Sequence, residues 1–166
     1  RISQEKHYAR TMRILARVRE SVPNIALTIV GTSDRFTQRY FEDLQQQARS
    51  LGDWIDFRQD LSRDDVRRLM ASYRYGLHAM REEHFGMAPA EMARAGMIVW
   101  VPNGGGQVEV VGHEPALMYE TDADAVTSIC TVIGSADEQS RLRVHLAHTT
   151  SRFSVDTFVT RIRSIV

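Results

Sequence analysis

The sequence predicts an α/β domain built on a doubly wound parallel sheet. Short apolar runs, such as residues 25–30 and 97–101, alternate with longer segments whose apolar residues recur every three or four positions. Alternation of this kind implies parallel strands joined by crossover helices. The 166 residues suffice for one domain with its own core, and neither an internal repeat nor a low-complexity linker divides them.

Six elements are expected in the first half of the chain. A helix with Tyr8, Met12 and Leu15 on its inner face ends at Pro23, and the continuous apolar run after it is typical of a strand buried on both faces. Ser62 caps the last helix of this half, with two acids in its first turn. In order, we predict a strand end, helix, strand, helix, strand and helix, at residues 1–3, 5–22, 25–30, 36–51, 54–57 and from 62 onward.

The second half continues the alternation. The predicted elements are a strand at 75–80, a turn and helix within 81–96, a strand at 97–101, a short helix at 107–111, a strand at 116–119, helices at 121–134 and 137–148, and a terminal helix from 153 to 166. Ligands of such sheets bind beyond the carboxyl ends of the strands. Arg1, the loop from Gly31, Arg58, Glu83 and Gly104 all follow predicted strands, which indicates one shared site.

Composition excludes several classes of function. Basic and acidic residues number 21 each and the pI is near 7.2, so no charged surface points to nucleic acid. The single cysteine, Cys130, fits a reducing compartment and lies in an apolar helical run that predicts a buried structural thiol. No apolar run reaches membrane-spanning length, so we expect a cytoplasmic protein. The opening at a strand end, without Met, predicts a fragment of a longer protein.

The stretch at residues 81–96 is the most informative part of the chain. Gly86 supplies the permissive backbone for a sharp turn between a strand and a helix. Pro89 is tolerated because it falls in the first helical turn, where its missing N–H costs little. Gly96 is placed to end the helix as the residue after the C-cap. The stretch therefore predicts strand, turn, helix and strand.

The start of this helix predicts an anion site. The amides near Met87 and Ala88 lie at the positive end of the helix without intrahelical acceptors, which suits a phosphate. Glu83 and Glu91 flank that position. Carboxylates repel phosphate, so we expect them to accept hydrogen bonds from sugar hydroxyls on either side of it. From the residues alone, an ordinary strand–helix turn with two solvated glutamates is an equal alternative.

Glu83 and Glu91 enclose seven residues that include Phe85-Gly86. This spacing resembles the E-x7-E signature of family 4 retaining glycosyltransferases, and the Glu-His-Phe-Gly form is similar to that of GDP-mannose-dependent mannosyltransferases. The resemblance spans almost the whole chain. It implies a Rossmann-like fold and makes residues 1–166 the C-terminal, nucleotide-sugar-binding half of a two-domain GT-B enzyme. The N-terminal acceptor domain would then be absent from this chain.

The same resemblance implies roles for individual residues. Arg1 and Lys6, five apart, match a basic pair that binds the donor diphosphate without a metal or other cofactor. Glu83 would orient the sugar and Glu91 the ribose, while His84 either touches the sugar or is a surface histidine that fixes the loop. The implied catalytic set is Glu83, Lys6 and Arg1, and the implied donor-binding set is His84, Phe85, Gly86, Met87, Ala88, Glu91, Arg58 and Gly105.

Gly105 and Arg58 enter this set on weaker motifs. The glycine turn at 104–106 resembles a family turn that lets backbone approach the ligand. Arg58 lies in the segment that usually borders the nucleotide base, although the family's glycine after that strand is missing. The stretch before the signature also departs from the family, and Glu82 offers a competing carboxylate that could replace Glu83.

The implied reaction is transfer of a hexose to a glycan or lipid-linked acceptor with retention of configuration and no protein nucleophile. GDP-mannose leads as donor, with UDP-sugars second. Two alternatives stay open, a GT-B-like epimerase of nucleotide sugars and a non-catalytic nucleotide-sugar-binding domain. His145 and His148 could share a metal, but no third ligand has suitable spacing. We expect cytoplasmic location, with peripheral association at the cytoplasmic membrane face in the full-length protein, and little transfer by this chain alone.

Overall fold

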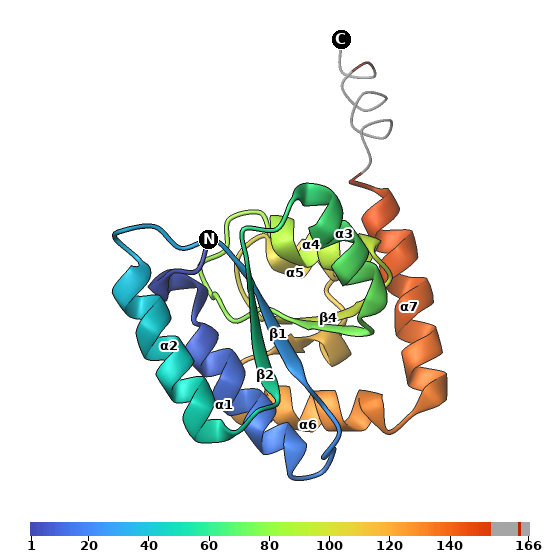
Figure 1. Cartoon of the computed structure of the whole chain (residues 1–166). Helices are drawn as coiled ribbons and strands as arrows, with labels where there is room; N and C mark the ends of the chain where they lie inside the picture. Colours follow the sequence, from blue (N-terminus) through green and yellow to red (C-terminus); the bar gives the residue numbers. More distant parts are fainter. Residues whose placement is uncertain (154–162, 164–166) are drawn as a thin grey trace.

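The computed structural model describes residues 1–153 and 163 (Figure 1). Helices and strands alternate through most of this range. The strands are β1 (Leu27–Gly31), β2 (Ile55–Gln59), β3 (Tyr75–Leu77), β4 (Ile98–Pro102) and β5 (Met118–Tyr119). The α-helices are α1 (Tyr8–Arg19), α2 (Gln38–Leu51), α3 (Arg63–Ser72), α4 (Met87–Arg94), α5 (Gln107–Val110), α6 (Asp122–Ile133) and α7 (Ala136–Ser151). Two 3-10 helices, η1 (Gln4–Lys6) and η2 (Pro115–Leu117), complete the order.

All paired strands are parallel, as the alternation predicts. Their hydrogen bonds divide them into two groups, β1-β2 and β3-β4-β5. The predicted parallel α/β fold is therefore confirmed, while β1 and β3, which a continuous sheet would join through an intervening strand, are not bonded to each other. In Figure 1, β1 and β2 lie in front of β4.

Local signals explain where the helices begin. The Ser62 hydroxyl accepts a hydrogen bond from the Asp65 amide at the start of α3. Thr121 and Asp124 form a reciprocal capping box at the start of α6. The strand β4 is buried at every position, which matches the continuous apolar run of the sequence. Of the predicted terminal helix at 153–166, all but residues 153 and 163 lie outside the described residues.

The prediction was wrong in detail at the start of the chain. Residues 1–3 form no strand, although Ser3 has extended backbone angles and the Ile2 amide donates to the Thr32 carbonyl at 2.7 Å. The helix expected at 5–22 is split into η1 and α1. His7, with a φ of 53°, lies between them, and this left-handed residue interrupts the helical path. The strand expected at 75–80 ends at Leu77.

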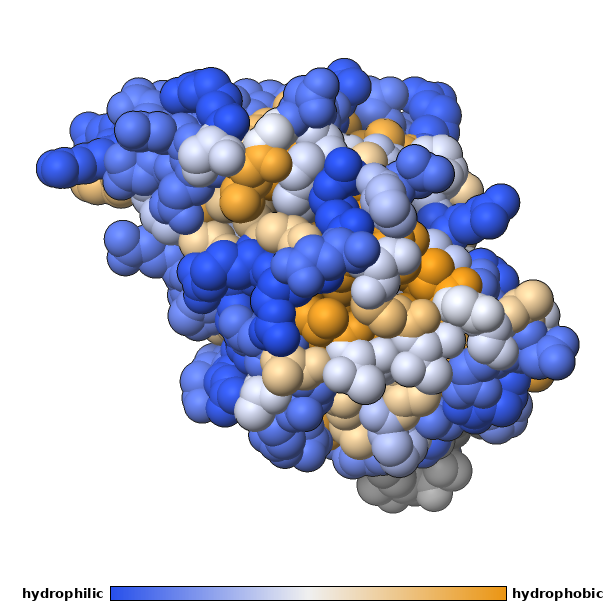
Figure 2. All heavy atoms as spheres, turned by 90° about the horizontal axis from the view of Figure 1, so that it is seen from below, coloured by the Kyte–Doolittle hydropathy of each residue, from blue (hydrophilic) through white to orange (hydrophobic). Residues whose placement is uncertain are grey.

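The core has two parts. The larger cluster is centred on β4, with Trp100 buried between β3, α6 and η2, and Cys130 is partly buried against it rather than fully enclosed. The smaller cluster joins Ile2 and Met12 to α2 and β1 through Phe41 and Ile29. Within the described residues, no helix is long and apolar enough to cross a membrane. The face seen from below carries an apolar patch among hydrophilic residues (Figure 2).

Candidate functional site

The helix α4 begins as the sequence predicts. Gly86 is its N-cap with a φ of 90°, a conformation that favours glycine, and Pro89 falls in the first turn. The helix ends before Gly96, which also has a φ of 90°. The first intrahelical bond runs from the Ala90 amide to the Gly86 carbonyl, so the amides of the preceding residues lack helical acceptors. This positive helix end follows the carboxyl end of β3.

Glu83 lies at the centre of the polar contacts beside that helix end. Its Oε2 atom is 3.0 Å from Lys6 Nζ, and its Oε1 atom accepts from the Gly86 amide at 3.3 Å. The side chains of Lys6 and Glu83 are 30% and 15% exposed, so the pair is shielded from water on most sides. Lys6 and Glu83 are 77 positions apart in the sequence and are in contact at the carboxyl edge of the strands.

Burial and charge act in opposite directions on the Glu83 carboxyl. Desolvation raises its pKa, but the hydrogen bond and charge of Lys6, together with the Gly86 amide, outweigh burial and hold that pKa below its usual range. Glu83 is therefore ionised at neutral pH. An ionised carboxylate can only accept hydrogen bonds, which is what a sugar hydroxyl requires of its partner.

His78 belongs to the same cluster and escaped the sequence reasoning. Its side chain is 9% exposed, and its Nε2 atom lies 3.3 Å from Glu83 Oε2 without forming an aligned hydrogen bond. Burial lowers the pKa of His78 to about 4, with Lys6 acting in the same direction and Glu83 opposing it. Its backbone is fixed at both ends, because the amide donates to the Trp100 carbonyl and the carbonyl accepts from the Tyr119 hydroxyl.

Only the position of His78, directly after a strand and five residues before Glu83, could have indicated this role from the sequence. That position alone does not distinguish a site histidine from a core histidine, so the decisive information is the three-dimensional contact.

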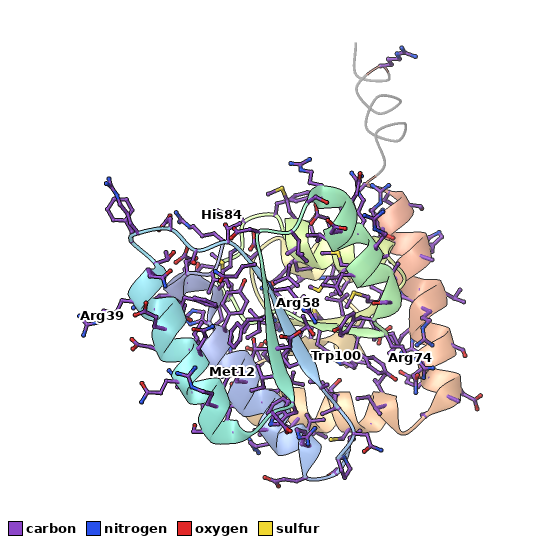
Figure 3. The ribbon with its side chains drawn as sticks, viewed as in Figure 1. Met12, Arg39, Arg58, Arg74, His84 and Trp100 are labelled. Atoms are coloured by element: carbon purple, nitrogen blue, oxygen red, sulfur yellow. The ribbon has the colours of Figure 1, made fainter. Side chains whose placement is uncertain are left out.

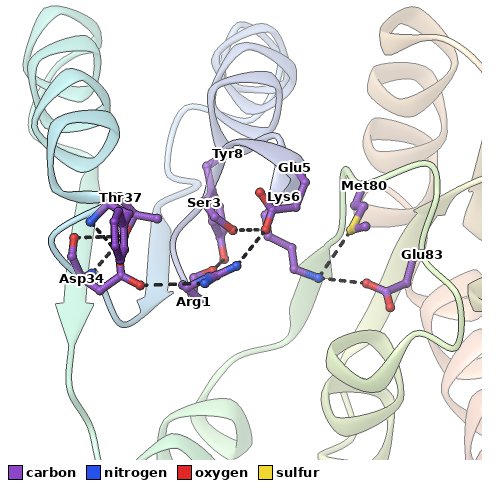
Figure 4. Close-up of polar contacts among 10 residues, drawn as sticks. Arg1, Ser3, Glu5, Lys6, Tyr8, Asp34, Thr37, Met80 and Glu83 are labelled. Carbon is purple, nitrogen blue, oxygen red and sulfur yellow. Dashed lines mark hydrogen bonds and ion pairs between the residues drawn. The ribbon is translucent and has the colours of Figure 1, made fainter.

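Arg1 and Lys6 do not act as a pair in this structure (Figure 4). Arg1 is 59% exposed and forms ion pairs with Glu5, at 3.6 Å, and with Asp34, at 3.8 Å. Lys6 turns the other way, to Glu83 and to the Met80 sulfur. The two side chains therefore contact different carboxylates, and the predicted binding of diphosphate by Arg1 requires its guanidinium to separate from Glu5 and Asp34.

The glycine turn after β4 packs against the signature loop. A Cβ atom on Gly105 or Gly106 would lie 2.2 Å from the carbonyl oxygen of Glu83 or His84, respectively. The Gly106 amide donates to the Glu83 carbonyl at 2.9 Å. These glycines therefore permit contact between two backbone segments, in addition to any ligand contact that the resemblance implies for Gly105.

Gln107 supports the same junction. It is fully buried, and its side-chain amide donates to the carbonyls of Met80 and Gly104, at 2.9 and 3.0 Å. The predicted short helix at this position is confirmed, and its first residue ties the two loops together. The sequence did not predict the burial of Gln107 or its two hydrogen bonds, because a buried glutamine cannot be distinguished from an exposed one by residue type.

Three more of the predicted donor-binding residues lie in α4 or in the loop before it. Glu91 is exposed one turn into α4, His84 is exposed, and the Phe85 ring is 51% exposed, with one edge-to-face contact to Phe153. Arg58 lies apart on β2, paired with Asp56 at 2.6 Å (Figure 3). In that view His84 and Arg58 are well separated, so a base-binding role for Arg58 stays a prediction.

Metal ligands do not gather in the part of the chain that the structure describes. No group of three His, Cys, Asp or Glu side chains is placed to hold an ion among those residues. The His145 ring contacts the Val111 carbonyl at 2.9 Å, and His148 is exposed. Transfer without a metal stays a prediction.

The described domain is Rossmann-like, with parallel strands alternating with helices. In this class of domain, ligands bind beyond the carboxyl ends of the strands, where the glycine-capped helix end and the lysine–glutamate pair lie. Comparison with protein families gives the particular family: residues 1–146 match the model of the glycosyl transferases group 1, and the chain belongs to that family.

Related proteins agree with this assignment. The human GDP-Man:Man(3)GlcNAc(2)-PP-Dol alpha-1,2-mannosyltransferase is 27% identical over 84% of this chain, and its Candida glabrata counterpart is 40% identical over 47%. This chain spans only 30% and 16% of those proteins, respectively. It thus covers a third or less of each of them.

Solved structures share the fold. The Anabaena Alr3699/HepE structure in complex with UDP and glucose superposes with a TM-score of 0.86 at 24% identity, over 99% of this chain and 46% of that one. The C-terminal domain of LpcC from Francisella tularensis, a group 1 glycosyl transferase family protein, gives a TM-score of 0.80 at 12% identity, over 93% and 83%. At these identities the superpositions establish the fold alone, and they confirm the predicted Rossmann-like fold of the GT-B type.

Proposed function

We propose that this domain binds a nucleotide sugar, with GDP-mannose as the first candidate, for transfer of the hexose to a glycan or lipid-linked acceptor. The observation that carries the proposal is the Lys6–Glu83 pair beside the free amides at the start of α4. Family membership gives the reaction class, and the printed name of the human relative supports GDP-mannose. The UDP in the Anabaena structure keeps UDP-sugars as the second candidate.

In this proposal the diphosphate binds at the α4 amides and takes Lys6 as its counter-ion. A leaving nucleoside diphosphate gains charge as the sugar–phosphate bond breaks, and an ammonium group stabilises that charge. Release of Lys6 frees Glu83 Oε2 to accept from a sugar hydroxyl, with His78 Nε2 3.3 Å away as a neighbouring donor. Glu91 accepts from the ribose. Arg1 joins the diphosphate only after leaving Glu5 and Asp34.

The full reaction needs more of the protein than this chain supplies. An acceptor domain on the N-terminal side of Arg1, facing the carboxyl edge, is part of the proposal. So is a cytoplasmic location at the membrane that carries a lipid-linked acceptor.

Calorimetric titration with GDP, UDP, ADP and GDP-mannose tests the donor site. Lys6→Ala and Glu91→Ala each remove a charge-assisted contact worth about 1.5–3 kcal/mol, so each should weaken binding roughly ten- to a hundredfold. Arg13→Ala and Glu20→Ala are matched controls, because both side chains are exposed on α1 or at its end. Equal loss in the controls, or unchanged affinity in Lys6→Ala, contradicts the proposal.

Lys6 also permits a chemical test, because it is the only lysine of the sequence. An amine-reactive reagent can therefore modify just two groups, Lys6 and the chain's terminal amine. Bound GDP should slow modification of Lys6 compared with a sample that contains no nucleotide. Equal modification with and without saturating nucleotide would place the diphosphate elsewhere.

A further inference from the structure

Arg10, in the first turn of α1, is a mostly buried cation that the proposed function does not use. Its side chain is 14% exposed, whereas Arg13 and Arg17, further along the same helix, are exposed. A guanidinium carries five N–H donors, and its burial is costly unless acceptors and an opposite charge surround it. The contacts of Arg10 therefore indicate what it holds in place.

The Arg10 guanidinium connects α1 to three other segments. Its Nε atom donates to Asp122 Oδ1 at 2.6 Å, in the first turn of α6. Its Nη1 atom donates to the Ala79 carbonyl at 3.4 Å, in the segment after β3. The guanidinium carbon lies 5.2 Å from the centre of the Tyr119 ring in β5, within the range of a cation–π contact. All three segments lie at the carboxyl edge of the strands.

Asp122 is the main anchor of the guanidinium, because its 2.6 Å contact is much closer than the contact to Ala79. A carboxylate also supplies the charge that a mostly buried arginine requires. The capping box of Thr121 and Asp124 fixes the start of α6, and α6 packs against α1 (Figure 1). Arg10 is therefore held at a defined place relative to both helices.

Tyr119 extends this network to a second backbone group. Its hydroxyl donates to the His78 carbonyl, so the carbonyls of two consecutive residues, His78 and Ala79, accept hydrogen bonds from side chains of other segments. The strand β3 ends at Leu77, just before these residues. Side-chain contacts therefore take part in fixing the backbone that leads from the end of β3 to Glu83.

Two bridges connect the same two segments of the chain. Lys6 and Arg10 are four positions apart on η1 and α1, and Ala79 and Glu83 are four positions apart between β3 and α4. Lys6 contacts Glu83, and Arg10 contacts Ala79. A lysine side chain is flexible and loses entropy when an ion pair holds it in one geometry. The second bridge, made by the more rigid guanidinium, limits how far the two segments can separate.

We propose that Arg10, anchored by Asp122, is a positioning residue for the Lys6–Glu83 pair. It holds the backbone before Glu83 close to α1, so that Lys6 Nζ stays within reach of the Glu83 carboxylate. Arg10 acts through this backbone and needs no contact with a ligand. The inference rests on the proposed function for what the pair binds, but the geometry of the pair can be tested without any nucleotide. Failure of the test is therefore distinct from failure of the donor site.

The reactivity of Lys6 reports whether the pair is intact, because an amine held by a carboxylate reacts more slowly with an acylating reagent than a free amine. Mass spectrometry of peptides distinguishes Lys6 from the terminal amine. Arg10→Gln should raise the rate of Lys6 modification roughly fivefold, equivalent to the about 1 kcal/mol of an ion pair. Arg13→Gln is the matched control, since Arg13 is exposed on the same helix, and it should leave the rate unchanged. An unchanged rate in Arg10→Gln overturns the proposal.

A double-mutant cycle separates positioning from a general loss of stability. In Glu83→Gln the carboxylate partner of Lys6 is already removed. Adding Arg10→Gln to that variant should therefore change the rate of Lys6 modification little, if Arg10 acts through the pair. A rise by the same factor in both backgrounds would mean that Arg10 acts on Lys6 in another way, and it overturns the proposal.

Asp122→Asn provides a milder variant for the case in which Arg10→Gln does not fold. The asparagine oxygen still accepts from Arg10 but lacks the charge, so we expect a rise in Lys6 modification of about twofold. Asp137→Asn is the matched control, because Asp137 is an exposed acid in the first turn of α7 and its loss has the same effect on a helix start. Equal rates in the two variants contradict the proposal.

Discussion

At the scale of single residues, the central feature is a carboxylate with three neighbours of different kinds. Glu83 contacts a cation, an amide and a neutral imidazole within 3.3 Å. Each neighbour can be tested alone, because Lys6 comes from η1, the amide from the α4 cap and His78 from the end of β3. Because Lys6 is paired with Glu83, a diphosphate has to compete with that carboxylate for the ammonium group.

Glu83→Gln separates the sugar contact from the phosphate contact. The amide keeps the shape of the carboxylate but removes its charge, so Lys6 is held less strongly. We expect GDP affinity to be unchanged or higher, while the ratio of GDP-mannose to GDP affinity falls roughly tenfold, the cost of about 1.4 kcal/mol in one contact. Calorimetry measures both affinities. Glu82→Gln is the matched control, and loss of the ratio in that variant instead would move the sugar contact by one residue.

His78 predicts a specific dependence of stability on pH. Its pKa falls from an ordinary value of 6.5 to about 4 in the folded chain, so the unfolded chain binds more protons between these values. Stability is therefore fully present above about pH 6.5 and is lost as the pH falls toward 4. Glu83, whose pKa is also lowered, adds a loss in the same direction below its ordinary value of 4.5. The His78 contribution is on the order of 3 kcal/mol.

Denaturant unfolding at a series of pH values measures this contribution. His78→Gln should lower stability at neutral pH and flatten the profile between pH 6.5 and 4.5. His148→Gln, at an exposed position, should leave the profile unchanged. If the stability of His78→Gln changes with pH as steeply as that of the unmodified chain, a group other than His78 causes the pH dependence.

At the scale of elements, the α4 junction combines local and distant requirements. The boundaries of α4 could be predicted from Gly86, Pro89 and Gly96, because the effect of each residue on the helix depends only on its own backbone conformation. The packing of Gly106 against the signature loop could not be predicted in this way, because it depends on His84, 22 positions earlier in the sequence. The same distinction explains why Lys6 was identified from its motif while His78, the other neighbour of Glu83, was not.

Gly106→Ala tests this packing. The new methyl group would lie 2.2 Å from the His84 carbonyl oxygen, and backbone has to move to admit it. We expect a loss of about 1–3 kcal/mol in unfolding free energy and weaker GDP binding. Gly104→Ala is the matched control, since its nearest contact is an ordinary 3.6 Å and it should cost much less. Equal costs for the two variants, measured by urea unfolding, would contradict the steric account.

At the scale of the whole molecule, the predicted alternation gave the correct order of elements, because hydrophobic periodicity is a local property that burial enforces. The prediction of where the first helix begins was wrong, because no strong sequence signal indicates the left-handed backbone of His7. The division of the strands into two groups could not be predicted either. Hydrophobic periodicity identifies a strand but does not show which neighbouring strands it is hydrogen-bonded to.

This chain alone should bind the donor without efficient transfer. The mannosyltransferases that it resembles are about three times as long, and the acceptor side of the reaction is assigned in our proposal to the additional length. Incubation with labelled GDP-mannose and a lipid-linked oligosaccharide should yield labelled product only when the longer protein is used. Efficient transfer by residues 1–166 would refute the two-domain proposal, whereas slow hydrolysis of the donor would be compatible with it.

The parallel pairing of every strand has a consequence for how the chain acquires its shape. The first pair in chain order, β1 with β2, joins Leu27 to Ile55, and within residues 1–153 no two-residue hairpin brings strands together locally. Each pairing must wait for a crossover of more than a dozen residues to close, so the helices can form earlier than any sheet contact. During that interval the apolar strands are exposed, and a newly made chain is at its greatest risk of association with other copies before β4 is enclosed.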